Sequence, residues 1–233
     1  MARNMAEPAA ESTYRYERKF YVDGLTMPEM TAVLRHHPAM FRPLYEPRHI
    51  NNIYLDSTAR NFYVDNVEGV ADRSKTRIRW YGDLYGVHAA TLELKIKRGF
   101  VGRKESYRLP AHEIRPGLSQ VAVLGWLRQS GLPDQVRSNI SSLRPALVNR
   151  YRRRYYLSAD GRYRLTVDDD QQFRGFPGGD LSRVARRDRG GVIVELKYAL
   201  GDDGDADRVS NAFPFRMTRS SKYVAGLERV EGL

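Results

Sequence analysis

The stretch Lys75-Thr-Arg77-Ile-Arg79-Trp-Tyr81 alternates polar or charged side chains with apolar ones, and Thr91-Leu-Glu93-Leu-Lys95-Ile-Lys97 and Tyr14-Arg15-Tyr-Glu17-Arg-Lys19-Phe20 do the same. Side chains at i, i+2 and i+4 of a β-strand point to one side, so each stretch predicts a strand with a charged face and an apolar face. A solvated strand face normally mixes Ser, Thr, Glu, Gln and Lys rather than repeating Arg and Lys. The repetition therefore indicates a basic concave surface for a polyanion.

The composition is globular and strongly basic. Of 233 residues, 41% are hydrophobic, and 39 Lys and Arg against 28 Asp and Glu give a net charge of +11. This charge favours nucleic acid, polyphosphate, nucleotides or an anionic membrane surface as partner. The absence of cysteine excludes disulfides and thiolate metal sites, and no run of 18 apolar residues predicts a membrane span. We expect a disordered tail at 1–12 without a signal peptide, a single domain at 13–233, and a cytoplasmic location.

Strands and turns follow one another along most of the chain. The alternation and its flanking turn residues predict strands at 14–22, 50–55, 61–67, 76–81, 90–97, 101–109, 146–157, 163–169 and 191–198. Helices are predicted at 27–37, at 221–230 and, broken at Gly131-Leu-Pro133, within 118–143, whereas 201–207 is typical of an exposed turn. Short connections favour antiparallel pairing, and a closed barrel removes unpaired strand edges. The predicted fold is α+β, an antiparallel barrel of roughly eight to nine strands with helices packed outside.

The same alternation predicts which side chains line the barrel. Besides the three opening stretches, the inner rows would contain Tyr151 and Arg153, then Arg164, Thr166 and Asp168, then Glu195 and Lys197. On the strand at 101–109 the inner row is either Lys104, Ser106 and Arg108 or Arg103, Glu105 and Tyr107. Periodicity leaves both rows open, and we favour the Lys104 row.

In their order along the chain, these residues resemble the VTC domain, the polyphosphate polymerase module of the vacuolar transporter chaperone, within the triphosphate tunnel (CYTH-like) superfamily. The similarity covers nearly the whole chain and depends on Tyr16-Glu-Arg-Lys19-Phe-Tyr21, Asn52-Ile-Tyr-Leu-Asp-Ser57, Arg77-Ile-Arg79, Glu93-Leu-Lys95-Ile-Lys97, Lys104-Glu-Ser106, Asn149-Arg-Tyr151-Arg-Arg153, Val194-Glu-Leu-Lys-Tyr198 and Arg219-Ser-Ser-Lys-Tyr223. It implies a tunnel of antiparallel strands that binds a triphosphate or a phosphate chain with a divalent metal.

The resemblance also implies roles for individual residues. Its phosphate ligands correspond to Lys19, Arg77, Arg79, Lys95, Lys104, Tyr151, Arg153, Arg219 and Lys222, and we add Lys97 and Lys197 as further phosphate-binding candidates. We expect Arg77, Arg79, Lys95 and Lys222 to be catalytic. Glu195 corresponds to the metal-binding glutamate, with Glu17 and Asp168 as further candidates.

Two departures from the family pattern matter. Arg219 stands where a lysine is usual, which keeps the charge but replaces a point ammonium by a planar fork. The superfamily's hydrolases typically open with Glu-x-Glu-x-Lys, whereas this chain has Arg15-Tyr-Glu17-Arg-Lys19 and so lacks one carboxylate. This difference favours the VTC branch over a triphosphatase.

The expected activity is transfer of the ATP γ-phosphate to a growing polyphosphate chain, with Mn2+ or Mg2+ as cofactor. The alternatives are a triphosphatase acting on inorganic or nucleoside triphosphate and a module that binds polyphosphate without turnover. We expect no specific nucleic-acid partner. Any export of the product would require a membrane-protein partner, which would hold the chain at the inner face of a membrane.

Overall fold

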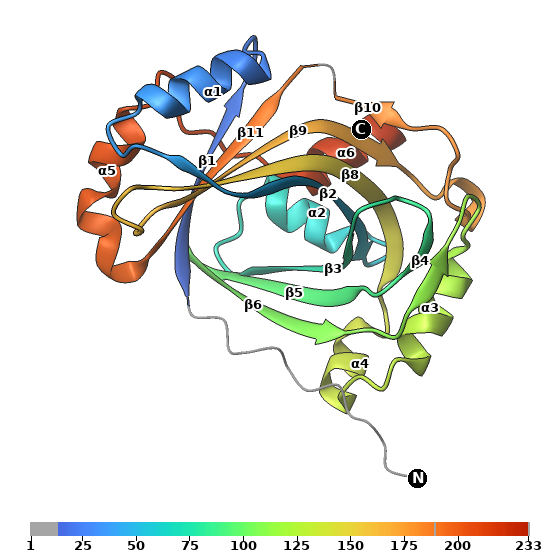
Figure 1. The fold of residues 1–233 in the computed structure, drawn as a ribbon. Coiled ribbons are helices and arrows are strands. Elements are labelled where there is room, and N and C mark those ends of the chain that lie inside the picture. The colour runs from blue at the N-terminus through green and yellow to red at the C-terminus, as the bar shows by residue number, and fades with distance from the viewer. Residues whose placement is uncertain (1–13, 189, 233) are drawn as a thin grey trace.

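Eight strands close into an antiparallel barrel in the computed structural model of the chain, which describes residues 14–188 and 190–232 (Figure 1). Around the barrel the order is β9-β11-β1-β6-β5-β3-β2-β8, with β8 pairing back onto β9, and β10 extends β9 outside the ring. The strands are β1 (Arg15–Val22), β2 (Arg42–Asp56), β3 (Arg73–Tyr81), β5 (Thr91–Arg98), β6 (Val101–Arg108), β8 (Arg144–Leu157), β9 (Arg164–Arg174), β10 (Arg186–Arg187) and β11 (Val192–Ala199). The predicted α+β barrel is confirmed.

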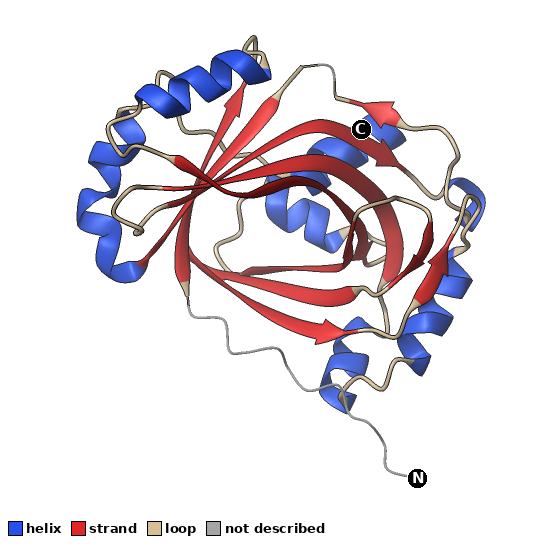
Figure 2. Cartoon of the chain, viewed as in Figure 1, coloured by secondary structure: helices blue, strands red, loops and turns tan. Residues whose placement is uncertain are grey.

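A small second sheet and six α-helices complete the described part of the chain (Figure 2). The sheet pairs β4 (Gly86–His88) with β7 (His112–Ile114). The helices are α1 (Met27–His36), α2 (Asn61–Val67), α3 (Gln120–Gln129), α4 (Asp134–Ile140), α5 (Asp203–Asn211) and α6 (Lys222–Glu231). None of the helices in the described ranges is long and apolar enough to cross a membrane. The tail predicted at 1–12 lies outside the described residues.

Two apolar cores lie on the outer face of the barrel wall, on opposite sides of the molecule in Figure 1. On one side, α3 and α4 pack against β3 and β5, so that Trp126 and Val136 share a core with Ile78 and Leu92. On the other, α1 and α5 pack against β1, β9 and β11 through a core that includes Phe20. Covering the apolar faces in this way leaves the charged faces to form the barrel interior.

The two remaining helices, α2 and α6, meet each other at one end of the interior. Tyr223 and Leu227 of α6 are buried against Tyr54, Leu147 and Phe173 of the inner wall, and Phe62 and Tyr63 of α2 pack onto the same cluster. The buried carboxylate of Asp56 joins the two helices, because it accepts hydrogen bonds from the backbone N–H of Phe62 at 3.0 Å and from the Tyr223 hydroxyl at 2.5 Å. This arrangement fixes the N-terminus of α6 beside β3.

The first part of β2 and the short strands β4, β7 and β10 were not predicted, and two predicted segments have another secondary structure. The strand predicted at 61–67 is wrong, since these residues form α2. Their aromatic and β-branched composition favours a strand, but Asp56 and Ser57 accept hydrogen bonds from the first N–H groups of the segment and hold it as a helix. The turn predicted at 201–207 is also wrong, because it contains the start of α5. Asp203 and Asp205 suit the positive end of the helix, and Ala206 and Val209 are buried.

Candidate functional site

The inner rows of the strands meet in the barrel interior, as the alternation predicts. Among the described residues, nine cationic side chains, eight on strands and one on α6, gather there around four carboxylates. The cations are Lys19, Lys75, Arg77, Arg79, Lys95, Lys104, Arg153, Lys197 and Lys222, and the carboxylates are Glu17, Glu93, Asp168 and Glu195. The interior therefore has an excess of positive charge.

Glu93 on β5 is the centre of the first ion-pair group. Its carboxylate lies 2.6 Å from Arg77, 3.6 Å from Arg79 and 2.8 Å from Lys104. Burial raises the pKa of Glu93, but the three cations outweigh it and hold the pKa well below its ordinary value. Glu93 stays ionised and fixes the two guanidinium groups on the inner wall.

Asp168 on β9 is the centre of a second group. It accepts two hydrogen bonds from Arg153, at 2.5 and 2.6 Å, and pairs with Lys222 at 2.6 Å. Arg153 and Lys222 also approach Glu195, at 3.3 and 3.5 Å. Arg153 and Lys222 therefore occupy both oxygens of Asp168, whereas Arg164, predicted on the same inner row, is exposed at the start of β9.

Glu17 and Glu195 share two lysines between β1 and β11. Lys19 lies 3.0 Å from Glu17 and 3.6 Å from Glu195, and Lys197 lies 3.7 Å and 3.0 Å from the same two carboxylates. Burial raises the pKa of Glu195, but Lys197, Lys222 and Lys19 hold it well below its ordinary value. Lys95 approaches Glu17 at 3.1 Å, and although Glu17 raises its pKa, burial and the nearby Lys19 and Lys197 lower it to about 8.

One interior cation was missed by the sequence analysis. Lys75 has the same strand parity as Arg77 and Arg79, which was the signal that could have found it. Its Nζ donates a 2.9 Å hydrogen bond to Ser221, the N-cap of α6. Burial lowers the pKa of Lys75, and so do Lys19, Lys95 and other neighbouring cations.

Lys75 lies at a basic end of the interior. We call it the Arg73 end, and it is formed by Arg73, Lys75, Lys97 and Arg219. Arg73 lies opposite Lys97 in the β3–β5 register. Burial lowers the pKa of both side chains, and the nearby guanidinium of the exposed Arg219 lowers it further. Within the described residues, none of these four side chains forms an ion pair with a carboxylate. The Arg73 end is therefore where the positive charge is least compensated.

The inner row of β6 is now defined. Lys104 reaches Glu93 and Ser106 is buried, whereas Arg103 pairs with Glu105 at 3.0 Å on the other face. The favoured Lys104 row is confirmed. The side chains of Lys95 and Lys104 remain 39% and 43% exposed, so an anion from solvent can reach them.

A divalent metal can be tested against these residues. No group of three or more His, Cys, Asp or Glu able to hold a metal occurs in the described ranges. Mg2+ is usually held by one or two carboxylates, and water and substrate phosphate complete its coordination. Glu195 and Glu17 could provide the carboxylates. Thr166, opposite Glu195 in the β9–β11 register, has a buried hydroxyl without a hydrogen-bond partner among the described residues. These oxygens fit a metal that is completed by a bound phosphate.

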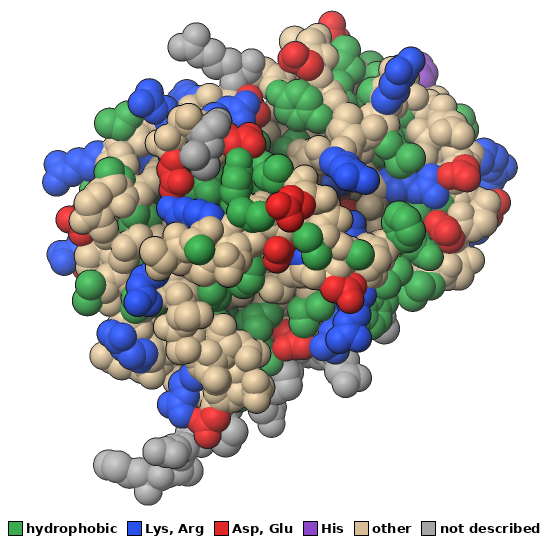
Figure 3. Space-filling model, turned by 180° about the vertical axis from the view of Figure 1, so that it is seen from behind, with side chains coloured by type: hydrophobic (Ala, Val, Ile, Leu, Met, Phe, Trp, Pro, Cys, Tyr) green, Lys and Arg blue, Asp and Glu red, His purple; other side chains and the backbone are tan. Residues whose placement is uncertain are grey.

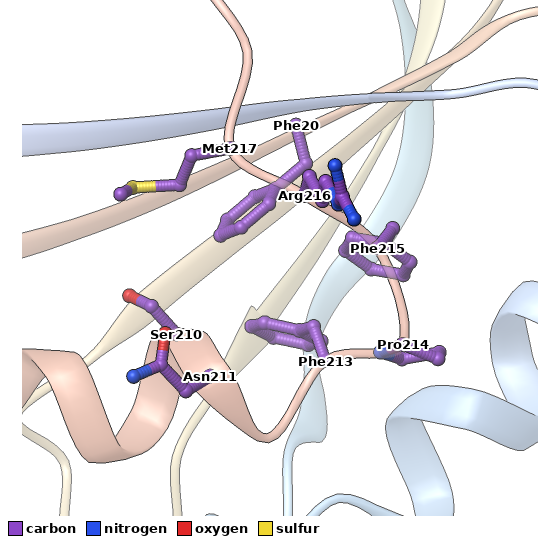
Figure 4. A pocket seen from close by; sticks show the side chains of 8 residues that line it. All are labelled: Phe20, Ser210, Asn211, Phe213, Pro214, Phe215, Arg216 and Met217. Carbon is purple, nitrogen blue, oxygen red and sulfur yellow. The ribbon is translucent and has the colours of Figure 1, made fainter.

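The face of the molecule seen from behind has a less concentrated charge than the interior. On the face that Figure 3 shows, Lys and Arg are scattered among acidic and hydrophobic side chains. A pocket of about 320 Å³ lies between Phe20, Phe213, Phe215 and Met217 (Figure 4). Phe20 belongs to the outer core, so this pocket is separated from the ionic interior by β1.

Comparisons with known proteins identify one family and several similar solved structures. The family model described as the VTC domain matches residues 14–231. Among solved structures, a protein from Hippeastrum described as an adenylyl cyclase candidate with a dominant triphosphatase activity is 16% identical, with 91% of this chain and 94% of that chain covered and a TM-score of 0.47.

Two further structures are similar over the same span. An adenylate cyclase candidate from Vibrio parahaemolyticus is 11% identical, with 91% and 98% of the two chains covered and a TM-score of 0.46. A protein from Pyrococcus horikoshii is 13% identical, with 90% and 94% covered and a TM-score of 0.43. No curated protein matches the chain.

Proposed function

The chain belongs to the VTC domain family, and from this premise we propose that it is a polyphosphate polymerase that transfers the γ-phosphate of ATP to a growing chain inside the barrel. The observation that carries the proposal is the excess of cations on the inner wall, where nine Lys and Arg surround four carboxylates. Such an excess suits a ligand with several negative charges in a row, because phosphoryl transfer depends mainly on positioning and charge neutralisation.

In this proposal the triphosphate lies among Arg77, Arg79, Lys95 and Lys104. Glu93 holds the two guanidinium groups, so their donors are positioned before the ligand arrives. The lysines are flexible and partly exposed, and they can turn from carboxylates toward phosphate oxygens. The acceptor chain would occupy the Arg73 end, whose cations lack ion-pair partners among the described residues.

The chemical step forms one bond and breaks one. An oxygen of the acceptor's terminal phosphate attacks the γ-phosphorus, the bond between the γ-phosphorus and the β–γ bridging oxygen breaks, and ADP leaves with the electron pair. Arg77, Arg79 and Lys222 would neutralise the charge on the transferring group. Glu195 and Glu17 would hold Mn2+ or Mg2+, which when bound neutralises charge on phosphate oxygens.

The direct test is incubation of the purified chain with ATP and Mn2+ or Mg2+. The proposal predicts ADP release together with acid-labile phosphate chains. Orthophosphate without chains would instead indicate a triphosphatase, and tight binding of polyphosphate without ADP release would indicate a binding module. Either result would refute the polymerase.

Neighbouring residues on β6 provide a matched pair of variants. Lys104→Ala removes an inward cation, and Arg103→Ala removes an outward one from the adjacent position. We expect Lys104→Ala to lower ADP release by at least tenfold, while Arg103→Ala keeps nearly full activity. Equal loss in both variants, with unchanged thermal unfolding, would contradict the assignment of the interior as the active site.

A further inference from the structure

Three tyrosines surround Arg48 at the end of the interior opposite the Arg73 end. The Arg48 guanidinium lies 4.6 Å from the ring centroid of Tyr81, 4.9 Å from that of Tyr155 and 6.0 Å from that of Tyr45. Its Nε also donates a 3.1 Å hydrogen bond to the Tyr155 hydroxyl. We call these four residues the Tyr81 cluster.

Two rings of this cluster are open to solvent, and the third, Tyr155, is half-buried. Tyr45 is 56% exposed and Tyr81 is 48% exposed, although large aromatic side chains are normally buried. Tyr45 and Tyr155 meet edge to face at 5.6 Å, so the rings support one another without being covered. In the described ranges, Arg48 has no carboxylate within salt-bridge distance. The cluster therefore presents exposed aromatic rings beside a guanidinium group that no carboxylate of the described residues neutralises.

The cluster continues the inner rows that carry the phosphate-binding candidates. Tyr81 comes two residues after Arg79 on β3, and Tyr155 comes two residues after Arg153 on β8. In a strand, two residues advance by roughly 7 Å on the same face. Arg48 lies opposite Arg153 in the β2–β8 register. β3 and β8 thus place Arg79 and Arg153 deeper in the barrel, and β2, β3 and β8 together place the Tyr81 cluster at its end.

We propose that the Tyr81 cluster is the base-stacking site for the nucleoside triphosphate whose phosphates lie among Arg77, Arg79, Lys95 and Lys104. This inference rests on the proposed function, because it assigns a place to the nucleoside of the phosphate donor. Exposed aromatic rings and arginine planes are the groups on which nucleic-acid bases stack. The donor would enter with its base at the Tyr81 cluster and its γ-phosphate pointing toward the Arg73 end.

The test compares ATP with inorganic triphosphate, which has the phosphates but no base. Isothermal titration of the full chain in EDTA measures binding without turnover. Tyr81→Ala should weaken ATP binding by about 5- to 150-fold and leave inorganic triphosphate binding unchanged, whereas Tyr81→Phe should keep the affinity for ATP. Phe100→Ala is the control, because Phe100 is 86% exposed in the β5–β6 turn at the other end.

The outcomes separate this inference from the proposed function. An ATP-specific loss in Tyr81→Ala establishes the stacking site even if the chain makes no polyphosphate. An unchanged ATP affinity, or equal losses for ATP and triphosphate, overturns it even if the polymerase activity is present. Should Tyr81→Ala not fold, Tyr45→Ala removes a more exposed ring of the same cluster and is judged by the same comparison.

Discussion

Replacing Glu93 by glutamine tests whether the interior is held by its ion pairs. The substitution keeps the size of the side chain and removes a negative charge that lies 2.6 Å from Arg77, 2.8 Å from Lys104 and 3.6 Å from Arg79. The side chain of Glu93 is only 4% exposed, so water cannot replace the missing charge. The variant would leave two guanidinium groups in the wall without their counterion.

Removing one partner of a buried ion pair typically costs about 3 to 5 kcal/mol of the free energy of unfolding. We expect the loss of unfolding free energy in Glu93→Gln to lie at the lower end of this range, because Lys104 is 43% exposed and can turn to solvent. For a chain of this size each kcal/mol lowers the melting temperature by about 2 to 4 °C, which gives a decrease of roughly 6 to 12 °C. Differential scanning calorimetry at low salt would measure it.

The pH dependence has a definite sign. The pKa of Glu93 in the folded chain lies well below its ordinary value, so its stabilising contribution is present above the unfolded pKa of about 4.3 and is lost as the pH falls through the folded value. The stability difference between the wild type and Glu93→Gln should therefore be constant from pH 5 to 8. It should shrink as the pH falls below about 4.

Glu105→Gln on the neighbouring strand is the matched control. Glu105 pairs with Arg103 at 3.0 Å, but both side chains are more than a third exposed, so this pair should contribute less than about 1 kcal/mol. Inorganic triphosphate should raise the melting temperature of Glu93→Gln more than that of the wild type, because the freed cations can bind it. A loss below about 1 kcal/mol in Glu93→Gln, or no added stabilisation by triphosphate, would refute this reasoning.

Two further predictions concern α6 and β3. In Gly226→Ala, the added Cβ would lie 2.4 Å from Phe173 and 2.6 Å from Leu147 and would push α6, with Lys222, away from the interior. The substitution should therefore destabilise the chain by about 1 to 3 kcal/mol in thermal unfolding and weaken triphosphate binding. Gly125→Ala in α3 is its control, since nothing lies within 4 Å of that Cβ; it should stabilise by up to about 1 kcal/mol, and an equal effect of both substitutions would contradict the packing argument. Lys75→Met should weaken triphosphate binding by titration calorimetry without lowering the melting temperature, because burial and its neighbours lower the pKa of Lys75 and its charge already costs stability. A lower melting temperature for Lys75→Met would show that Lys75 holds α6 through Ser221 instead.

The sequence was sufficient for the barrel because one physical rule governs most of it. Alternation with period two separates apolar from charged side chains on β1, β3, β5 and β11, and only a closed sheet with helices outside buries one face of every strand. Segment 61–67 could not be predicted this way. Its helical state depends on Asp56 and on contact with α6, which lies about 160 residues later in the chain, and no local pattern contains that contact.

The alternation indicated which side chains share an inner row, although Lys75 was missed, but it could not predict how those side chains pair with one another. Alternation places Glu93, Lys95 and Lys97 on one row. It cannot show that Glu93 forms ion pairs with Arg77 and Arg79 on one neighbouring strand and with Lys104 on the other. Those partners depend on strand order and register, which are set by long-range pairing. The Tyr81 cluster was invisible for the same reason, since its members come from β2, β3 and β8.

The two ends of the barrel interior differ in their side chains. Glu93, Asp168, Glu195 and Glu17 hold cations in the middle of the barrel, while the Arg73 end has cations without ion-pair partners in the described part of the chain and the Tyr81 cluster has exposed rings. A symmetric phosphate chain would need no aromatic end, and a nucleotide alone would need no second basic end. In the proposed polymerase, the nucleoside would enter at the Tyr81 cluster and the phosphate chain would extend at the Arg73 end.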